Sequence, residues 1–305
     1  MRSALPERLR EGVVLLDGAM GTALMARGLA AGTPPEAWNL ERPGDVRAVH
    51  AGYVHAGSVV VQTNTFGANP VALERHGLAG RMADVNRRAV DLAREAAGPE
   101  RLVAGSMGPT GSLLTPLGDA TQAGLTEAFA RQAAALAEAG ADYLAVETMM
   151  DLAEALCALR GARQATGLPV TVCLTFERRR RGFFTLMGNR PADCARALAA
   201  AGAVAVGANC SVGSDEMVEL CAEFADASEL PVVVKPNAGL PELADGRPVY
   251  RQAAGDFARD MVAVVEAGAR AVGGCCGTDH TFIAALARAL ADARAGGATG
   301  PEATG

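Results

Sequence analysis

Eight short runs of β-branched and other apolar residues recur along the chain, and longer stretches rich in alanine, leucine and arginine separate them. The runs have the length of strands, and the stretches between them have the apolar periodicity of helices. Strands that alternate with helices in this way form parallel sheets. The runs begin near Val13, Val59, Leu102, Tyr143, Val170, Ala203, Val232 and Ala271. Eight such units predict a closed (β/α)8 barrel, the TIM-barrel architecture of the α/β class.

Chain length and helix ends favour a single domain. The chain has 305 residues, of which 50% are hydrophobic, and this is modestly more than one such barrel needs. Several helical stretches end in Ala-Gly just before the next strand, where glycine is the usual left-handed helix stop. These pairs are Ala56-Gly57, Ala139-Gly140, Ala201-Gly202 and Ala267-Gly268. We therefore expect one barrel over residues 1–305, with a frayed tail over residues 292–305.

Charge and hydrophobicity argue against nucleic-acid and membrane partners. The formal net charge is −6, and the lysines and arginines form no basic stripe that would follow a phosphate backbone. No apolar run approaches the roughly 18 residues that span a bilayer, and the N-terminal residues lack the apolar centre of a signal peptide. We expect a cytoplasmic protein, in which the seven cysteines stay reduced.

Polar and glycine-rich segments directly follow most of the predicted strands. In this architecture the loops after the strands converge on one face, which carries the active site. The segments include Asp17-Gly18-Ala19, Gln62-Thr63-Asn64, Gly105-Ser106-Met107, Glu147-Thr148, Asn209-Cys210, Lys235-Pro236-Asn237 and Gly274-Cys275-Cys276. The concentration of acids, amides and thiols predicts an active site there, although tight turns explain individual glycines equally well.

Three cysteines lie at predicted strand ends, Cys210 after the sixth strand and the pair Cys275-Cys276 after the eighth. Successive side chains on a regular strand point to opposite faces, so both members of the pair reach one ion only if the backbone turns there. Zinc prefers soft thiolates in tetrahedral geometry, and three protein ligands leave one position for a substrate. A thiol bound at that position becomes a nucleophilic thiolate at neutral pH. We predict one catalytic Zn2+ per chain on these three thiols.

The other potential metal ligands are expected to have structural roles. Four cysteines in helical or mid-strand contexts are expected to be ordinary buried residues, namely Cys157, Cys173, Cys194 and Cys221. His280 follows the cysteine pair by four residues. We expect it to begin the last helix, because Thr278-Asp279 before it is typical of a helix cap.

The strand-end segments, in this order, closely resemble the homocysteine S-methyltransferase family. That family includes the homocysteine-binding barrel of cobalamin-dependent methionine synthase and enzymes that use betaine or S-methylmethionine. The resemblance runs from Leu16-Asp17-Gly18 to the segment that contains Cys275 and Cys276, which is nearly the whole chain. It implies a zinc barrel in which Cys210, Cys275 and Cys276 are the ligands. Homocysteine sulfur would be the methyl acceptor, and methionine the product.

The resemblance also implies which residues bind the amino-acid part of homocysteine. Asp17 and Glu147 match family acids that hold the ammonium group, and carboxylates suit an ammonium. The alternative for both is a polar turn residue that caps a helix. Further residues expected near the substrate are Gly18, Thr63, Ser106 and Asn209. Asn209, together with Asn237, would also fix the loops around the opening of the barrel, on the face where the loops after the strands converge.

The methyl donor differs among the branches of the family. A chain of 305 residues is too short for the folate, cobalamin and reactivation modules of a full methionine synthase. The segments Gly108-Pro109-Thr110-Gly111 and Pro236-Asn237-Ala238-Gly239-Leu240-Pro241 look more like the cobalamin-dependent branch. We therefore expect a methyl-corrinoid carried by a separate partner protein. S-methylmethionine is the second candidate, and betaine is the third, because one tryptophan and three tyrosines make a poor cage for a quaternary ammonium.

Three alternatives stay open at this stage. The chain could be a zinc- or thiol-binding subunit without turnover. The loop around Trp38 either covers the mouth as a lid or packs on the surface. Four consecutive arginines, Arg178 to Arg181, follow the fifth predicted strand, and a solvated loop is favoured there over a site for an acidic ligand.

Overall fold

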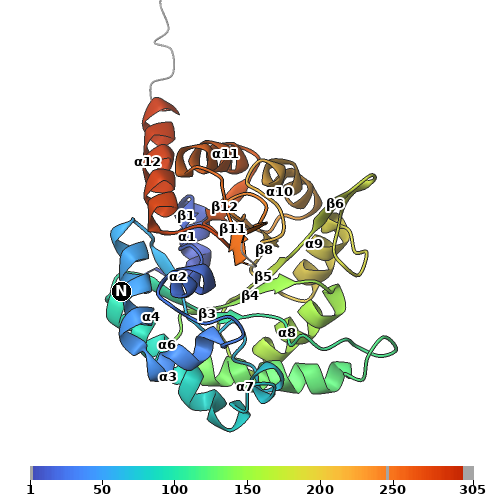
Figure 1. Cartoon of the computed structure of the whole chain (residues 1–305). Coiled ribbons are helices and arrows are strands. Elements are labelled where there is room, and N and C mark those ends of the chain that lie inside the picture. The colour runs from blue at the N-terminus through green and yellow to red at the C-terminus, as the bar shows by residue number, and fades with distance from the viewer. Residues whose placement is uncertain (1–2, 245–246, 298–305) are drawn as a thin grey trace, which may run out of the picture.

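The computed structural model describes residues 3–244 and 247–297, and its central feature is a barrel of eight parallel strands (Figure 1). The hydrogen-bonded order is β1-β12-β9-β8-β5-β4-β3-β2, and every pairing in it is parallel. The strands are β1 (Val14–Leu15), β2 (Val60–Gln62), β3 (Leu102–Met107), β4 (Tyr143–Met149), β5 (Val170–Leu174), β8 (Ala205–Asn209), β9 (Val232–Lys235) and β12 (Ala269–Val272). Each begins within two residues of its predicted start, and the predicted (β/α)8 barrel is confirmed.

Single hydrogen bonds, rather than a regular ladder, join β1 to β2. The Val59 amide donates to the Leu15 carbonyl over 2.9 Å, and the Ser58 hydroxyl donates to the Leu16 carbonyl over 3.1 Å. Toward the carboxyl ends of the two strands, the Gln62 amide donates to Asp17 Oδ2 over 2.7 Å. The Asp17 side chain thus occupies the place of a strand carbonyl, and this fixes it at the carboxyl end of the barrel.

Helices surround the barrel, and their ends follow the expected glycine pattern (Figure 1). Gly57, Gly140, Gly202 and Gly268 all have positive φ, between 90° and 115°. The longer helices are α4 (Pro43–His55), α6 (Met82–Ala97), α7 (Gln122–Glu138), α8 (Leu152–Ala165), α9 (Pro191–Ala200), α10 (Glu216–Ala227), α11 (Ala254–Glu266) and α12 (His280–Gly297). Shorter ones are α2 (Met20–Ala26), η1 (Pro35–Ala37), α3 (Trp38–Glu41), α5 (Pro70–Glu74) and η2 (Ala79–Arg81).

A further short helix, α1 (Leu5–Glu11), closes the amino-terminal end of the barrel. Its Leu5 and Leu9 are buried in one apolar cluster with side chains from all eight strands, among them Val60, Tyr143 and Val233. Burial of a leucine side chain contributes about 1.5–3 kcal/mol. The two leucines therefore hold α1 against the barrel, and they exclude water from this end of its interior.

The arginine run is exposed to solvent, as expected, but Arg178 and Arg179 belong to a short hairpin rather than to a loop. β6 (Glu177–Arg179) and β7 (Gly182–Phe184) pair antiparallel. Arg178 lies over the ring of Phe183 and forms ion pairs with Glu216 and Glu219 of α10. The acidic first turn of α10 thus offsets part of the like charge, which allows this segment to pair as strands.

A second hairpin follows β9, and the C-terminal helix extends into the expected tail. The hairpin consists of β10 (Glu242–Ala244) and β11 (Arg247–Val249). Residues 292–297 belong to α12, and the rest of the expected tail, residues 298–305, lies outside the described residues. Within the described ranges, the structure contains no helix long and apolar enough to cross a membrane.

Candidate active site

A pocket of about 250 Å³ opens at the carboxyl end of the barrel. Residues at the carboxyl ends of β2, β3, β4 and β9, and from the loops after β1, β2, β8 and β12, line it. Eight of the nine predicted site residues belong to this lining: Asp17, Gly18, Thr63, Ser106, Glu147, Cys210, Cys275 and Cys276. The ninth, Asn209, is fully buried and lies outside the lining.

The three predicted thiols form one compact cluster. Their sulfur atoms all lie within 4.8 Å of one another, and the Sγ atoms of Cys210 and Cys276 are 4.0 Å apart. Tetrahedral zinc with bonds of about 2.3 Å places two sulfur ligands about 3.8 Å apart. In the part of the chain that the structure describes, this is the one cluster of at least three metal-ligating side chains. Its size and its soft donor atoms fit zinc.

Backbone turns after β8 and β12 bring the thiols together. Cys210 follows β8 with a positive φ of 62°, a conformation that costs a non-glycine residue roughly 1–2 kcal/mol. The Cys210 amide donates to the Lys235 carbonyl over 2.9 Å. After β12, the Cys275 amide donates to the Pro236 carbonyl over 2.7 Å, and the Cys276 carbonyl accepts from Ala238 over 2.9 Å. These bonds turn the chain so that both neighbouring cysteines face the pocket.

Without a cation the three thiols resist ionisation. Hydrogen bonding with Cys210, together with burial, raises the pKa of Cys275 to about 12. Three neighbouring thiolates would repel one another strongly in a buried site. A divalent cation offsets that repulsion and stabilises the thiolates. The donor set therefore fits a bound metal better than it fits three free thiolates.

Asn209 ties the thiol cluster to the carboxyl end of β4. Its side chain donates to Thr148 Oγ1 over 2.7 Å and to Cys275 Sγ over 3.8 Å, and its Oδ1 accepts from the Thr148 amide over 2.7 Å. Thr148 has a positive φ of 61°, which this pair of bonds holds in place. Since Asn209 does not line the pocket, the structure places it as a support of the loops.

Asp17 presents one unpartnered carboxylate oxygen to the site. Its side chain is buried, Oδ2 accepts from the Gln62 amide, and Oδ1 has no hydrogen-bond partner. Burial raises the pKa of Asp17 to about 7, although the nearby Lys235 ammonium opposes this shift. A buried acceptor without a donor costs about 1–3 kcal/mol, so Asp17 Oδ1 suits a donor that arrives with a ligand.

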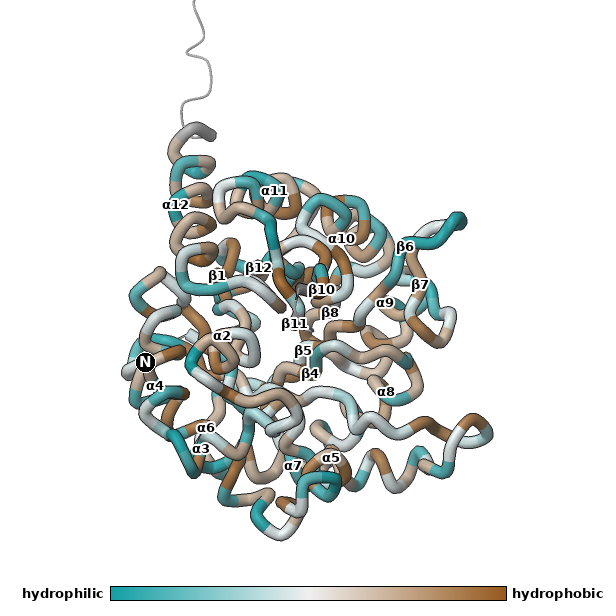
Figure 2. Tube along the Cα trace, viewed as in Figure 1, coloured by the Kyte–Doolittle hydropathy of each residue, from teal (hydrophilic) through white to brown (hydrophobic). Residues whose placement is uncertain are grey.

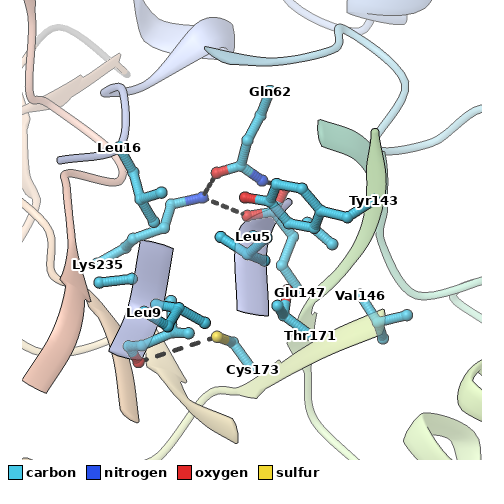
Figure 3. Close-up of a pocket in the computed structure, with 13 residues that line it drawn as sticks. Leu5, Leu9, Leu16, Gln62, Tyr143, Val146, Glu147, Thr171, Cys173 and Lys235 are labelled. Carbon is cyan, nitrogen blue, oxygen red and sulfur yellow. Dashed lines mark hydrogen bonds and ion pairs between the residues drawn. The ribbon is translucent and has the colours of Figure 1, made fainter. Parts of the chain in front are cut away.

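Glu147 lies at the centre of a polar network inside the barrel (Figure 3). Its Oε1 accepts from Gln62 Nε2 over 3.0 Å and from the Ser106 hydroxyl. Its Oε2 forms an ion pair with Lys235 Nζ over 2.6 Å. Ser106 is in turn fixed by Thr63, whose hydroxyl accepts from the Ser106 amide over 3.0 Å.

Gln62 and Lys235 are the members of this network to which sequence reasoning assigned no role. Lys235 ends β9, which otherwise consists of three valines, and it is buried. Burial disfavours its ammonium, but Glu147 and Asp17 together outweigh burial and raise its pKa above the ordinary value for lysine. The sequence did contain a signal for its role, because Lys235 is a charged residue at the end of an otherwise apolar strand.

Gly18 is required by the close approach of two other segments. A Cβ at this position would lie 2.8 Å from the Tyr53 ring and 2.9 Å from Thr278 Oγ1. The Tyr53 hydroxyl donates to the Ala19 carbonyl over 2.7 Å, which joins the first loop to α4. This packing holds Asp17 beside the pocket.

The remaining predictions concern residues outside the pocket. Trp38 is buried and lies under the Arg42 guanidinium at 4.4 Å, so it packs inward, while Pro35 and Glu36 of the same segment line the pocket. His280 is the first residue of α12 and lies outside the thiol cluster, as expected. The four cysteines expected to be structural are buried, namely Cys157, Cys173, Cys194 and Cys221.

Comparison with known proteins agrees with this geometry. The sequence profile of the family described as homocysteine S-methyltransferase matches residues 14–290. The chain belongs to the homocysteine S-methyltransferase family. It is 33% identical to methionine synthase from Mycobacterium tuberculosis, and the match covers 93% of this chain but 25% of that protein. The likeness to methionine synthase from Mycobacterium leprae is similar, with 33% identity over 94% of this chain and 25% of that protein. The chain thus spans about a quarter of the length of these curated relatives.

A solved structure from this family resembles the barrel closely. It is the metallated form of the homocysteine methyltransferase MmuM from Escherichia coli, with a TM-score of 0.77 and 29% identity. The match covers 92% of this chain and 99% of that chain. The chain therefore shares both sequence and fold with an enzyme whose structure has been solved in a metallated form.

Proposed function

We propose that the chain is a zinc-dependent homocysteine S-methyltransferase that forms methionine, with one zinc held by Cys210, Cys275 and Cys276. The observation that carries this proposal is the presence of three clustered thiols and two carboxylates in one pocket. Homocysteine has a sulfur at one end and an ammonium at the other, and the two halves of the pocket suit these two groups. The likeness to metallated MmuM supports the metal.

The residues of the chain then have distinct tasks. Bound to the three thiolates, zinc would supply a Lewis acid that keeps the substrate sulfur ionised at neutral pH. Asp17 and Glu147 bind the ammonium group, and this orients the substrate sulfur toward the thiol cluster. Fixed orientation of this kind lowers the barrier to a displacement reaction, which needs an in-line approach. Thr63 and Ser106 hold Glu147 in place through the hydrogen bonds described above.

We propose a methyl-corrinoid on a partner protein as the donor. The similarity to two methionine synthases favours it. Exposed apolar side chains on the loops that follow the strands also favour it, because such side chains offer apolar contacts to a partner protein. They are Phe66, Leu113, Leu117, Met150, Leu186, Met187, Leu240 and Leu243. The loop between β3 and α7, which carries two of them, projects from the barrel (Figure 2).

Small donors are the alternatives. S-methylmethionine is the first of them. Betaine is less suited, because Phe66 is the single aromatic residue in the pocket lining and one ring makes no cage for a quaternary ammonium.

Methionine formation from each donor tests the proposal. Zinc-loaded protein is incubated with homocysteine and with methylcobalamin, a methyl-corrinoid protein, S-methylmethionine or betaine. We expect the corrinoid protein to be the best donor and free methylcobalamin to be a poor one. Replacing Leu113 and Leu117 with serine should slow transfer from the corrinoid protein and leave transfer from free methylcobalamin unchanged.

Two results would redirect the assignment. Turnover with S-methylmethionine alone at an ordinary enzymatic rate, about 1–10 per second, would make that sulfonium the donor. Zinc-loaded protein that forms no methionine from any donor would be a binding subunit.

The pH dependence should report Asp17. Its pKa of about 7 lies well above that of an exposed aspartate because the side chain is buried. Below that pH the carboxyl is protonated and loses the charge that attracts an ammonium. We expect kcat/KM for homocysteine to fall as the pH is lowered through 7, because this parameter reports groups of the free enzyme. The Asp17→Asn variant should lose this inflection and keep the inflections that arise from the substrate thiol.

A further inference from the structure

Lys235 is a buried cation inside the substrate pocket, and the chemistry proposed above gives it no task. Its side chain is 8% exposed. It extends from the end of β9 across the barrel to Glu147 and Gln62, above the apolar layer formed by Leu5 and Leu9 (Figure 3). Placing a cation inside a protein costs several kcal/mol unless it is paired. A lysine at this position therefore calls for a specific role.

Glu147 and Asp17 differ in how many of their carboxylate oxygens have a hydrogen-bond partner. Both oxygens of Glu147 have partners, because Oε1 accepts from Gln62 and Ser106 and Oε2 accepts from Lys235. Asp17 has one oxygen engaged by the Gln62 amide, while Oδ1 is buried and unpartnered. The oxygen that lacks a donor thus belongs to Asp17, and Lys235 already neutralises the charge of Glu147.

We propose that Lys235 is a positioning residue that anchors the Glu147 carboxylate and thereby leaves Asp17 Oδ1 as the main acceptor for the ammonium of homocysteine. This inference rests on the proposed function, and it divides the roles of the two acids. Two carboxylates and one lysine carry a net charge of −1, which attracts the ammonium end of homocysteine. Without the lysine, two buried carboxylates repel each other, and one of them takes up a proton or moves away.

Binding of two thiols to the zinc-loaded protein tests this role. The thiols are homocysteine and 4-mercaptobutanoate, which has the same chain but no amino group, and calorimetry gives both Kd values. We expect Lys235→Met to raise the Kd of homocysteine about tenfold or more, because the ammonium no longer meets a fixed, ionised acceptor. The Kd of 4-mercaptobutanoate should change less than about threefold, because the analogue makes no bond to the acids.

A double variant separates a charge effect from damage to the fold. Glu147→Gln combined with Lys235→Met removes both members of the ion pair and leaves Asp17 as the remaining charge. We expect this protein to bind homocysteine more tightly than Lys235→Met does, although less tightly than the wild type, because the net charge around Asp17 is again −1. The zinc content and Tm of each variant are measured in parallel.

The possible outcomes distinguish this role from the proposed function. If Lys235→Met raises the Kd of both thiols equally, or raises neither Kd, the role of Lys235 is overturned while the enzyme assignment stands. A wild-type protein that binds neither thiol would overturn the proposed function, and the inference about Lys235 with it. The expected result is that Lys235→Met weakens the binding of homocysteine selectively and that the double variant recovers part of this loss.

Discussion

Replacing Cys275 with alanine should leave the purified protein without its metal and without methyl transfer. Two sulfurs cannot supply the three protein ligands of a catalytic zinc site, and metal affinity depends steeply on the number of ligands. Zinc content should fall from about one per chain to below about 0.1, measured by atomic absorption after dialysis. Cys210→Ala and Cys276→Ala should behave alike, because all three sulfurs lie within 4.8 Å of one another.

Buried cysteines away from the cluster provide the matched controls. Cys157→Ala and Cys221→Ala remove a thiol of the same size, and these two cysteines are fully or almost fully buried in the core. They should keep their zinc, with a moderate loss of Tm because each leaves a small cavity. Normal zinc content in all three cluster variants would rule out this metal site.

Replacing Asp17 with asparagine should raise the KM for homocysteine strongly and leave zinc in place. A hydrogen bond to a charged group contributes about 1.5–3 kcal/mol, which corresponds to about 10- to 150-fold in KM. The substitution should not lower Tm at neutral pH. Burial raises the pKa of Asp17, so its ionised form destabilises the fold as pH rises toward 7, and an asparagine has no such cost.

Replacing Glu147 with glutamine should lower Tm, which replacing Asp17 with asparagine should not do. Its KM should also rise, but Tm should fall as well, because the Lys235 ammonium loses the carboxylate that lies 2.6 Å away. Removal of one partner of a buried ion pair typically costs 3–5 kcal/mol. Loss of zinc with an unchanged KM, in either variant, would assign that acid to the metal instead of the substrate.

Much of the fold followed from local patterns, because a parallel barrel repeats one signal eight times. The runs that begin at Val59, Leu102 and Val232 were short, apolar and flanked by turn residues, and they are strands. The polar residues after them had to share one face, since every strand of such a barrel points the same way. Position at the strand ends distinguished Cys210, Cys275 and Cys276 from the four cysteines in the core, and the family resemblance agreed with that choice.

Features that depend on distant partners could not be predicted from these patterns. The arginine run suggested a loop because its like charges repel, but Glu216 and Glu219 pair with Arg178 from about 40 residues further along the chain. The role of Lys235 also depends on distant partners, because the side chains that it contacts, Gln62 and Glu147, belong to β2 and β4. Helix α1 is too short to carry a clear periodic signal, and its place depends on the shape of the barrel end that it closes.

The helix that closes the amino-terminal end of the barrel has a consequence for the order of events in catalysis. With Leu5 and Leu9 filling that end, the pocket has no rear exit through the barrel axis. In the proposed reaction, homocysteine, the methyl group and methionine would all pass through the same opening. A donor protein seated over that opening blocks it, so homocysteine has to enter before docking, and methionine can leave only after the donor protein departs. The kinetic sequence with such a donor is therefore compulsory, and undocking becomes a step that can limit turnover.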